Sequence, residues 1–255
     1  MYNERETQFL QELEAKLIPY YTPPACPGGH DFLHVKSMIQ LGSRIQLLMS
    51  DENRKPNLLE YDVTCWLHNI DRPHELNKEI GGDKRKLADI CYDYLSGSPL
   101  STEQRLRIVD AVIEHPKFKD DLDRDSSVLT AIRIADKVVR LGPDGIVSAA
   151  AFRGPELLAY NPNNPFGYQS TVEGKLKTVY NDFMRVLEWY EMLPFDWARD
   201  LVRERDMNAY LSFVRSFGRM IAQRCDVMNK VEEDIQRALG KYYKKFNPYI
   251  GIEQF

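Results

Sequence analysis

The sequence contains few cysteines, and none of them lies close to another. Cys26, Cys65, Cys91 and Cys225 are spread over 255 residues, and no CxxC pair is present. Most of these cysteines fall in segments with helical periodicity, and their spacing is unlike that of a disulfide framework. The sequence therefore predicts free thiols in a reducing compartment, which for this chain means the cytoplasm.

Long uncharged apolar segments and an excess of one charge are also missing. No stretch approaches the roughly 18 apolar residues of a transmembrane helix, and residues 1–16 are acidic and amphipathic, unlike a signal peptide. The 34 Lys and Arg residues nearly balance the 38 Asp and Glu residues. We therefore expect neither a membrane nor a nucleic acid as partner. A small-molecule substrate is the favoured partner, and the sequence leaves a homo-oligomer open.

Alternation of the β-strand type is the third absence. Apolar residues recur at helical spacing almost throughout the chain, which predicts an all-α protein. No repeat, low-complexity tract or strong linker divides the sequence, and a chain of 29.7 kDa with 43% hydrophobic residues can bury a sizeable core. We expect a single helical domain over residues 1–255, with a core at about 25–150 and closing helices at about 170–245.

Capping and turn residues divide the helical pattern. Asp31, Asp83 and the pairs Ser101–Gln104 and Ser170–Glu173 are suited to begin helices. We expect helices that start at each of these positions and others over residues 4–17, 58–70 and 196–245, with one helix leading to His115 and one containing Asp136. His74 is expected in an exposed loop. Further loops are predicted at 50–57, 117–125 and 154–167.

Only five histidines are present, and all of them lie between residues 30 and 115. His68 ends an apolar segment, and Asp136 interrupts another, where an unpaired carboxylate would cost several kcal/mol. A divalent cation bound by both side chains would satisfy both groups. Imidazole and carboxylate ligands suit Mn, Fe, Co, Ni or Zn, and suit Mg less well. The alternative without a metal is a buried ion pair between His68 and Asp136, and spacing alone leaves the two interpretations even.

Several motifs together resemble the HD-domain phosphohydrolase superfamily. HDFLH at 30–34, the doublet in WLHNID and ADKVVRLGPDGI at 135–146 are similar to segments of its bacterial single-domain members, and the resemblance extends to AFRG at 151–154 and the C-terminal segments. It implies an HD-domain-like helical bundle with additional C-terminal helices. It also implies hydrolysis of a phosphomonoester, phosphodiester or pyrophosphate bond, in a nucleotide or other small phosphate compound, through a metal-activated water.

The resemblance assigns roles to particular residues. His34, His68, Asn69 and Asp136 match the metal ligands of the family. His115 is a candidate for proton transfer because imidazole titrates near neutral pH, and a purely structural role at its helix end is equally compatible. Positive charge for substrate phosphates is expected from basic residues beside the ligands, which are Arg72, Lys137, Arg140 and Arg153.

The chain departs from the family pattern at two positions. Asn69 stands in place of the aspartate of the HD doublet, and Ser37 stands where many members have arginine. An amide offers one neutral oxygen in place of a charged pair, so metal affinity should fall. Four explanations are open. Asp71 supplies the missing carboxylate in a catalytic role, the site binds one metal more weakly, the activity is lost, or the substitution was introduced to trap a ligand. The alternative function is a degenerate HD domain that binds a nucleotide or a protein partner without hydrolysis.

Overall fold

Helices joined by turns and loops make up the described part of the chain. The computed structural model describes residues 2–49, 55–116, 126–163, 178–225 and 230–247. These ranges contain no extended strand, and an isolated β-bridge joins Leu158 and Thr178. The helices are α1 (Glu4–Tyr21), α2 (Phe32–Leu48), α3 (Leu58–Leu67), α4 (His74–Ile80), α5 (Lys84–Tyr94), α6 (Thr102–Glu114), α7 (Ser127–Val139), α8 (Pro143–Arg153), α9 (Val179–Glu191), α10 (Asp196–Arg203), α11 (Met207–Cys225), α12 (Lys230–Leu239), the 3₁₀ helix η3 (Gly240–Tyr242) and α13 (Tyr243–Phe246). The all-α prediction is confirmed.

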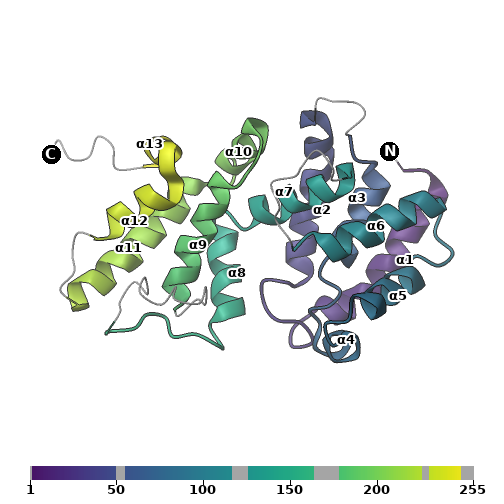
Figure 1. Cartoon of the computed structure of the whole chain (residues 1–255), viewed down its shortest axis with the longest axis horizontal. Helices are drawn as coiled ribbons and strands as arrows, with labels where there is room; N and C mark the ends of the chain where they lie inside the picture. Colours follow the sequence, from purple (N-terminus) through teal and green to yellow (C-terminus); the bar gives the residue numbers. More distant parts are fainter. Residues whose placement is uncertain (1, 50–54, 117–125, 164–177, 226–229, 248–255) are drawn as a thin grey trace. The chain divides into compact units, whose positions relative to one another are not determined.

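The chain divides into two compact units (Figure 1). The first, Met1–Asp136, contains α1–α6 and most of α7, and the second, Lys137–Phe255, contains the end of α7 and the remaining helices. The expectation of one domain over the whole chain stays a prediction. Within the described ranges, no helix combines the length and the apolar character that crossing a bilayer requires.

Helix α3 is the central helix of the first unit. Its residues from Leu59 to Leu67 are all buried, and α1, α2 and α6 pack against it. The approach of α2 depends on Gly42, because a Cβ atom at this position would come within 2.7 Å of the Tyr61 ring. The Tyr61 hydroxyl also donates a hydrogen bond to the carbonyl of Met38 at 2.7 Å. A small residue on α2 and a hydroxyl on α3 therefore hold these two helices close together.

Side-chain caps fix the beginnings of the helices in this unit. Asp31 accepts hydrogen bonds from the backbone at the start of α2, Asp83 does so for α5, and Ser101 forms a capping box with Gln104 for α6. These three predictions are confirmed, because the groups that form a cap lie within a few residues of one another. Asn57 caps α3 in the same way and was not anticipated.

Other boundaries differ from the predictions. Helix α1 continues past Leu17 to Tyr21, where both residues are buried, and α3 ends at Leu67, so that residues 68–71 form a turn. His74 is exposed as expected but begins α4 instead of lying in a loop. Pro73, the N-cap of α4, is well tolerated there because an N–H group at the start of a helix has no acceptor within the helix.

Residues 196–245 contain several helices where one long helix was predicted. The break between α10 and α11 falls at Asp206, which has a positive φ of 51° and accepts a hydrogen bond from Ala209 N at 3.1 Å. Aspartate can adopt this left-handed conformation and cap a helix at once. Helix α9 begins after the N-cap Thr178. The expected capping box at Ser170 and Glu173, and the loop expected at 117–125, lie outside the described residues.

A buried carboxylate on α3 gives the first unit a pH-dependent stability. Burial raises the pKa of Asp62 from its usual 3.8 to about 6, although a hydrogen bond from the Tyr2 hydroxyl, at 2.6 Å, and the charge of Lys36 act in the opposite direction. The folded chain therefore binds this proton more tightly than the unfolded chain. The contribution to stability is fully present below pH 4 and is lost as the pH rises from about 4 to 6.

Asp62→Asn should therefore stabilise the protein at pH 7.5 by roughly 1–3 kcal/mol, since the amide is neutral and can still accept the Tyr2 hydrogen bond. The difference should be much smaller at pH 4, where the folded wild-type carboxyl is protonated and the carboxyl of the unfolded chain has begun to bind its proton. Urea unfolding of both proteins between pH 4 and 7.5 measures it. A difference that does not change with pH would show that the Asp62 carboxyl is not the titrating group.

Candidate metal centre

Three helices of the first unit carry the candidate ligands. His34 lies in the first turn of α2, whose N-cap is Asp31; His68 follows the last residue of α3 as its C-cap; and Asp136 lies in the last turn of α7. The burial of α3 and the close approach at Gly42 bring α2 and α3 together. The fold thus joins side chains that are far apart in the sequence.

The ligand atoms of these three side chains converge. Nε2 of His34 lies 3.2 Å from Nε2 of His68 and 3.2 Å from Oδ1 of Asp136, and ligand atoms from all three residues lie within 4.8 Å of one another. The His34 and His68 rings are 5.3 Å apart. Both histidines are buried, whereas the Asp136 side chain is 22% exposed. The cluster therefore has one side that solvent can reach.

The donor set fits a divalent cation. Ligand atoms placed about 2.1 Å from an ion at tetrahedral or octahedral corners lie about 3.0–3.4 Å apart, which agrees with the two separations of 3.2 Å. Two imidazoles and one carboxylate suit Mn, Fe, Co, Ni or Zn better than Mg. The cluster could thus hold such an ion with small side-chain movements.

Two helix C-termini meet beside the cluster. His68 is the C-cap of α3 and His115 is the C-cap of α6, and their rings are 5.3 Å apart. Each ring places Nδ1 near the backbone carbonyl three residues earlier, at 2.7 Å for His68 and 2.8 Å for His115. A carbonyl can only accept, so Nδ1 carries the proton in both rings and Nε2 keeps its lone pair. Helix C-termini also carry partial negative charge, which favours a cation here.

Both histidines are held in the neutral form. Burial and the neighbouring His34 and His115 rings lower the pKa of His68 well below its usual 6.5, while Asp136 opposes the shift. Burial also lowers the pKa of His115, against the attraction of Asp136. Neutral imidazole is the form that binds metals, so little proton competition is expected at neutral pH.

Asn69 contacts the cluster in a way that the sequence did not suggest. Its Nδ2 lies 2.7 Å from Nε2 of His68, and both residues are buried. Because Nδ1 of His68 carries the proton, the Asn69 amide donates to the Nε2 lone pair. That lone pair is the one a metal would need. The Asn69 side chain must therefore turn away, or present its oxygen, before His68 can act as a ligand.

Two further candidate residues lie near His115. The charge of Asp71 raises the pKa of His115 and that of Arg72 lowers it, and Arg72 Nε is 3.6 Å from Asp71 Oδ1. Asp71 is not part of the three-residue cluster with His34, His68 and Asp136. The structure therefore places Asp71 and Arg72 beside the candidate proton-transfer residue instead of among the candidate ligands.

The remaining basic candidates belong to the second unit. Lys137 is buried in the last turn of α7, and Arg140 follows the end of that helix, with its guanidinium 5.9 Å from the centre of the Trp189 ring. Arg153 ends α8, 4.0 Å from Asp182. The charges of Arg153 and Arg140 both lower the pKa of Asp182, although burial, the largest effect, raises it. Their role in substrate binding stays a prediction.

One residue that supports the site was not anticipated from the sequence. Arg133 is buried in α7, one helical turn before Asp136, and its Nη2 donates to the carbonyl of Glu114 at 2.9 Å. This bond ties α7 to the end of α6 directly before His115. A charged residue in the apolar segment IRIAD was the available signal, the same kind of signal that singled out Asp136.

Comparison with known proteins places this geometry in a known fold. No family model matches the sequence, and neither does any curated protein. Solved structures do match. A Lactobacillus plantarum structural-genomics target has a TM-score of 0.62 at 17% identity, covering 88% of this chain and all of that one. Bacillus subtilis YpgQ in complex with ADP has a TM-score of 0.52 at 17% identity, covering 86% and 99%.

A third match carries a family description. An HD-superfamily hydrolase from Bacillus thuringiensis has a TM-score of 0.56 at 15% identity, covering 84% of this chain and 97% of that one. At such low identity the match concerns the arrangement of the chain, and it agrees with the expectation drawn from the HDFLH, HNID and ADKVVRLG segments. The chain therefore shares its helical fold with these solved structures, one of which is described as an HD-superfamily hydrolase.

Proposed function

We propose that the protein is a metal-dependent phosphohydrolase that acts on a nucleotide or another small phosphate ester or anhydride. The observation that carries the proposal is the convergence of His34, His68 and Asp136, with two separations of 3.2 Å, beside the C-termini of two helices. Two imidazole nitrogens and a carboxylate oxygen this close together are well suited to share one positive ion. A divalent cation is such an ion, and two negative helix ends favour it further.

The residues around the cluster support a division of roles. A cation held by His34, His68 and Asp136 would supply an activated water and polarise a phosphoryl oxygen. His115 commits Nδ1 to the Val112 carbonyl, so Nε2 is the atom able to exchange a proton with a substrate oxygen. Arg72 lies near His115 and carries the charge that a phosphate group would meet there.

A nucleotide is the substrate class that the comparisons favour. YpgQ, whose fold this chain shares, was solved in complex with ADP. ADP contains a phosphoanhydride and a phosphate ester, the bonds that the proposed centre would hydrolyse.

Asn69 supports a second candidate function. Its amide donates to the lone pair of His68 that a metal would need, and it brings no negative charge to the site. A domain with this substitution could bind a nucleotide or a protein partner without hydrolysing a bond. The alternative predicts stabilisation by a nucleotide with no product formed.

A panel of nucleoside mono-, di- and triphosphates, assayed for phosphate and pyrophosphate release with Mn²⁺, tests the two functions. We expect release from at least one compound, with full loss of activity in excess chelator. Thermal unfolding with the same compounds gives the second readout. A rise in Tm with a nucleotide but no product under any metal would overturn hydrolysis and favour the binding function. Full activity in chelator would overturn the metal mechanism.

A further inference from the structure

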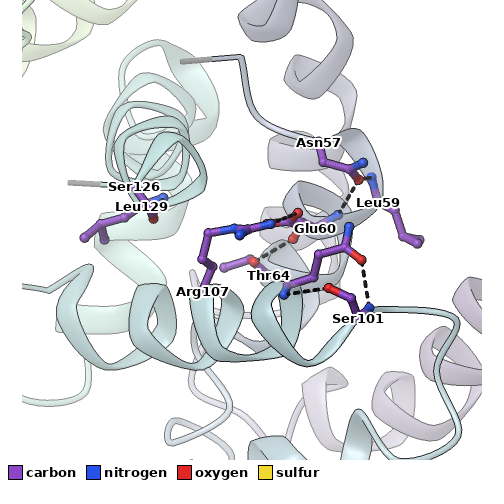
Figure 2. Close-up of polar contacts among 9 residues, drawn as sticks. Asn57, Leu59, Glu60, Thr64, Ser101, Arg107, Ser126 and Leu129 are labelled. Atoms are coloured by element: carbon purple, nitrogen blue, oxygen red, sulfur yellow. Dashed lines mark hydrogen bonds and ion pairs between the residues drawn. The ribbon is translucent and has the colours of Figure 1, made fainter. Parts of the chain in front are cut away.

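The first unit contains an ion pair outside the candidate metal centre, in which a buried carboxylate meets a guanidinium whose side chain is 44% exposed. Glu60, in the first turn of α3, has a side chain that is only 5% exposed. Its Oε2 accepts from Nε of Arg107 at 3.0 Å, and its Oε1 accepts from Nη2 of Arg107 at 2.7 Å (Figure 2). A planar guanidinium that binds both carboxylate oxygens fixes direction as well as distance. The pair therefore constrains how α3 and α6 lie against each other.

The ion pair lies at the same sequence distance from two site histidines. Glu60 precedes His68 by eight residues on α3, and Arg107 precedes His115 by eight residues on α6. Eight helical residues span about 12 Å. The two helices thus touch at the ion pair and again eight residues later on each chain segment, where the His68 and His115 rings are 5.3 Å apart. It follows that α3 and α6 run in the same direction and in matching register.

Glu60 lies in the first turn of α3, and Arg107 lies one turn after the capped start of α6. Asn57 accepts hydrogen bonds from the backbone N–H groups of Leu59 and Glu60, and the capping box of Ser101 holds the first turn of α6 (Figure 2). Thr64 adds a hydrogen bond from its hydroxyl to the carbonyl of Glu60 at 2.6 Å. The carboxylate is thus held by backbone that is itself well fixed.

The rest of the interface does not specify register equally well. The buried residues of α6 are Ile108, Val109, Ala111 and Val112. Contacts between such side chains are non-directional, so they tolerate a small axial shift of one helix along the other. An ion pair with one buried and one half-exposed partner contributes little net stability compared with apolar residues, and the best-attested use of buried ionic groups is to select one register. The position of His115 beside His68 is the property that register controls here.

We propose that Glu60 and Arg107 form a positioning pair for the metal centre, setting the axial register of α6 on α3 and so placing His115 beside His68. The proposed effect of the pair on the two histidine rings is argued from helix geometry and does not depend on the proposed function. The consequence for metal binding rests on the proposed function. Neither residue touches the metal or the substrate.

Four variants test this proposal against a purely structural role, the fourth being the Arg107→Lys protein described below. Arg107→Met leaves the Glu60 carboxylate without its partner and should lower Tm by roughly 3–5 °C, a modest shift because Arg107 is itself half-exposed. Glu60→Met combined with Arg107→Met replaces the pair by apolar side chains and should restore Tm. Leu13→Ala, in a buried position of α1, lowers Tm without touching either residue. Binding of Mn²⁺, the visible spectrum of the Co²⁺ form and the imidazole NMR resonances of the metal-free protein are measured for each.

The proposal predicts a separation between stability and site geometry. Arg107→Met and the double variant should both weaken Mn²⁺ binding by at least about tenfold, alter the Co²⁺ spectrum, and shift the His68 and His115 resonances or weaken the nuclear Overhauser effects between their rings. Leu13→Ala should lower Tm and change none of these. Arg107→Lys, which keeps the charge but not the planar fork, should give an intermediate Kd.

Two outcomes would overturn it. One is a double variant that recovers both Tm and the wild-type imidazole resonances, because the pair would then contribute stability alone. The other is Arg107→Met with unchanged resonances and a Kd within twofold of wild type. If the wild-type protein binds neither Mn²⁺ nor Co²⁺, the proposed function fails, and the imidazole resonances of the metal-free variants still decide whether the pair positions the histidines.

Discussion

His68→Ala is expected to weaken Mn²⁺ binding by more than about 100-fold and to reduce metal-dependent turnover below about 1% of wild type. Changes to residues that only orient a ligand already cost 10–100-fold in many metal sites, and this substitution removes a ligand itself. Nε2 of His68 lies 3.2 Å from Nε2 of His34 and within reach of Asp136. No other described histidine lies in the same cluster, so the loss should not be compensated.

Isothermal titration with Mn²⁺ and product release in the nucleotide assay measure these effects. His74→Ala is the matched control: the same substitution at an exposed histidine of α4 should leave both quantities unchanged. Thermal unfolding confirms that the variant is folded. Wild-type metal affinity in a folded His68→Ala protein would show that the ion binds elsewhere, and wild-type turnover would remove this cluster from the mechanism.

Asn69→Asp is expected to tighten Mn²⁺ binding by about 10- to 100-fold. Two effects act in the same direction. The carboxylate adds a negative charge and two oxygens where the amide offered one neutral oxygen. The substitution also removes the N–H group that donates to Nε2 of His68 at 2.7 Å, which frees the lone pair. Turnover should rise with metal occupancy when Mn²⁺ is limiting.

Asn69→Ala separates the two effects. It removes the competing donor but supplies no ligand, so its Mn²⁺ affinity should lie between those of the wild type and the aspartate variant. Titrations of the three proteins at one pH provide the comparison. Equal affinities in all three would mean that position 69 does not contact the ion, and activity that appears only in Asn69→Asp would identify Asn69 as the residue that keeps the natural chain inactive.

The features that the sequence predicted well depend on neighbours along the chain. The caps at Asp31, Asp83 and Ser101 could be anticipated because a side chain and the backbone it caps lie within three residues. The gathering of His34, His68 and Asp136 was suggested by the family resemblance. The sequence spacing alone was equally compatible with a metal site and with a simple ion pair. The distances among these three side chains are set by the packing of three helices, which spacing does not reveal.

Features that depend on packing could not be anticipated from the sequence. Gly42 looked like an ordinary helical residue, yet the Tyr61 ring fills the space that a Cβ would need. Glu60 stood in an apolar segment just as Asp136 did, but its partner Arg107 is 47 residues away. The break at Asp206 was missed because its flanks favour helix, and only a left-handed backbone reveals it.

The wide separation of the three candidate ligands in the sequence affects how the protein unfolds. His34, His68 and Asp136 are separated by 34 and then 68 residues, so no peptide fragment of ordinary length contains the site. Bringing such distant points together carries an entropic cost that the folded helices have already met. An ion held there would act as a reversible cross-link across most of the first unit, and it would have to leave before α2, α3 and α7 could separate. Supply of the metal would then govern the lifetime of the folded chain and its resistance to proteases as well as its chemistry.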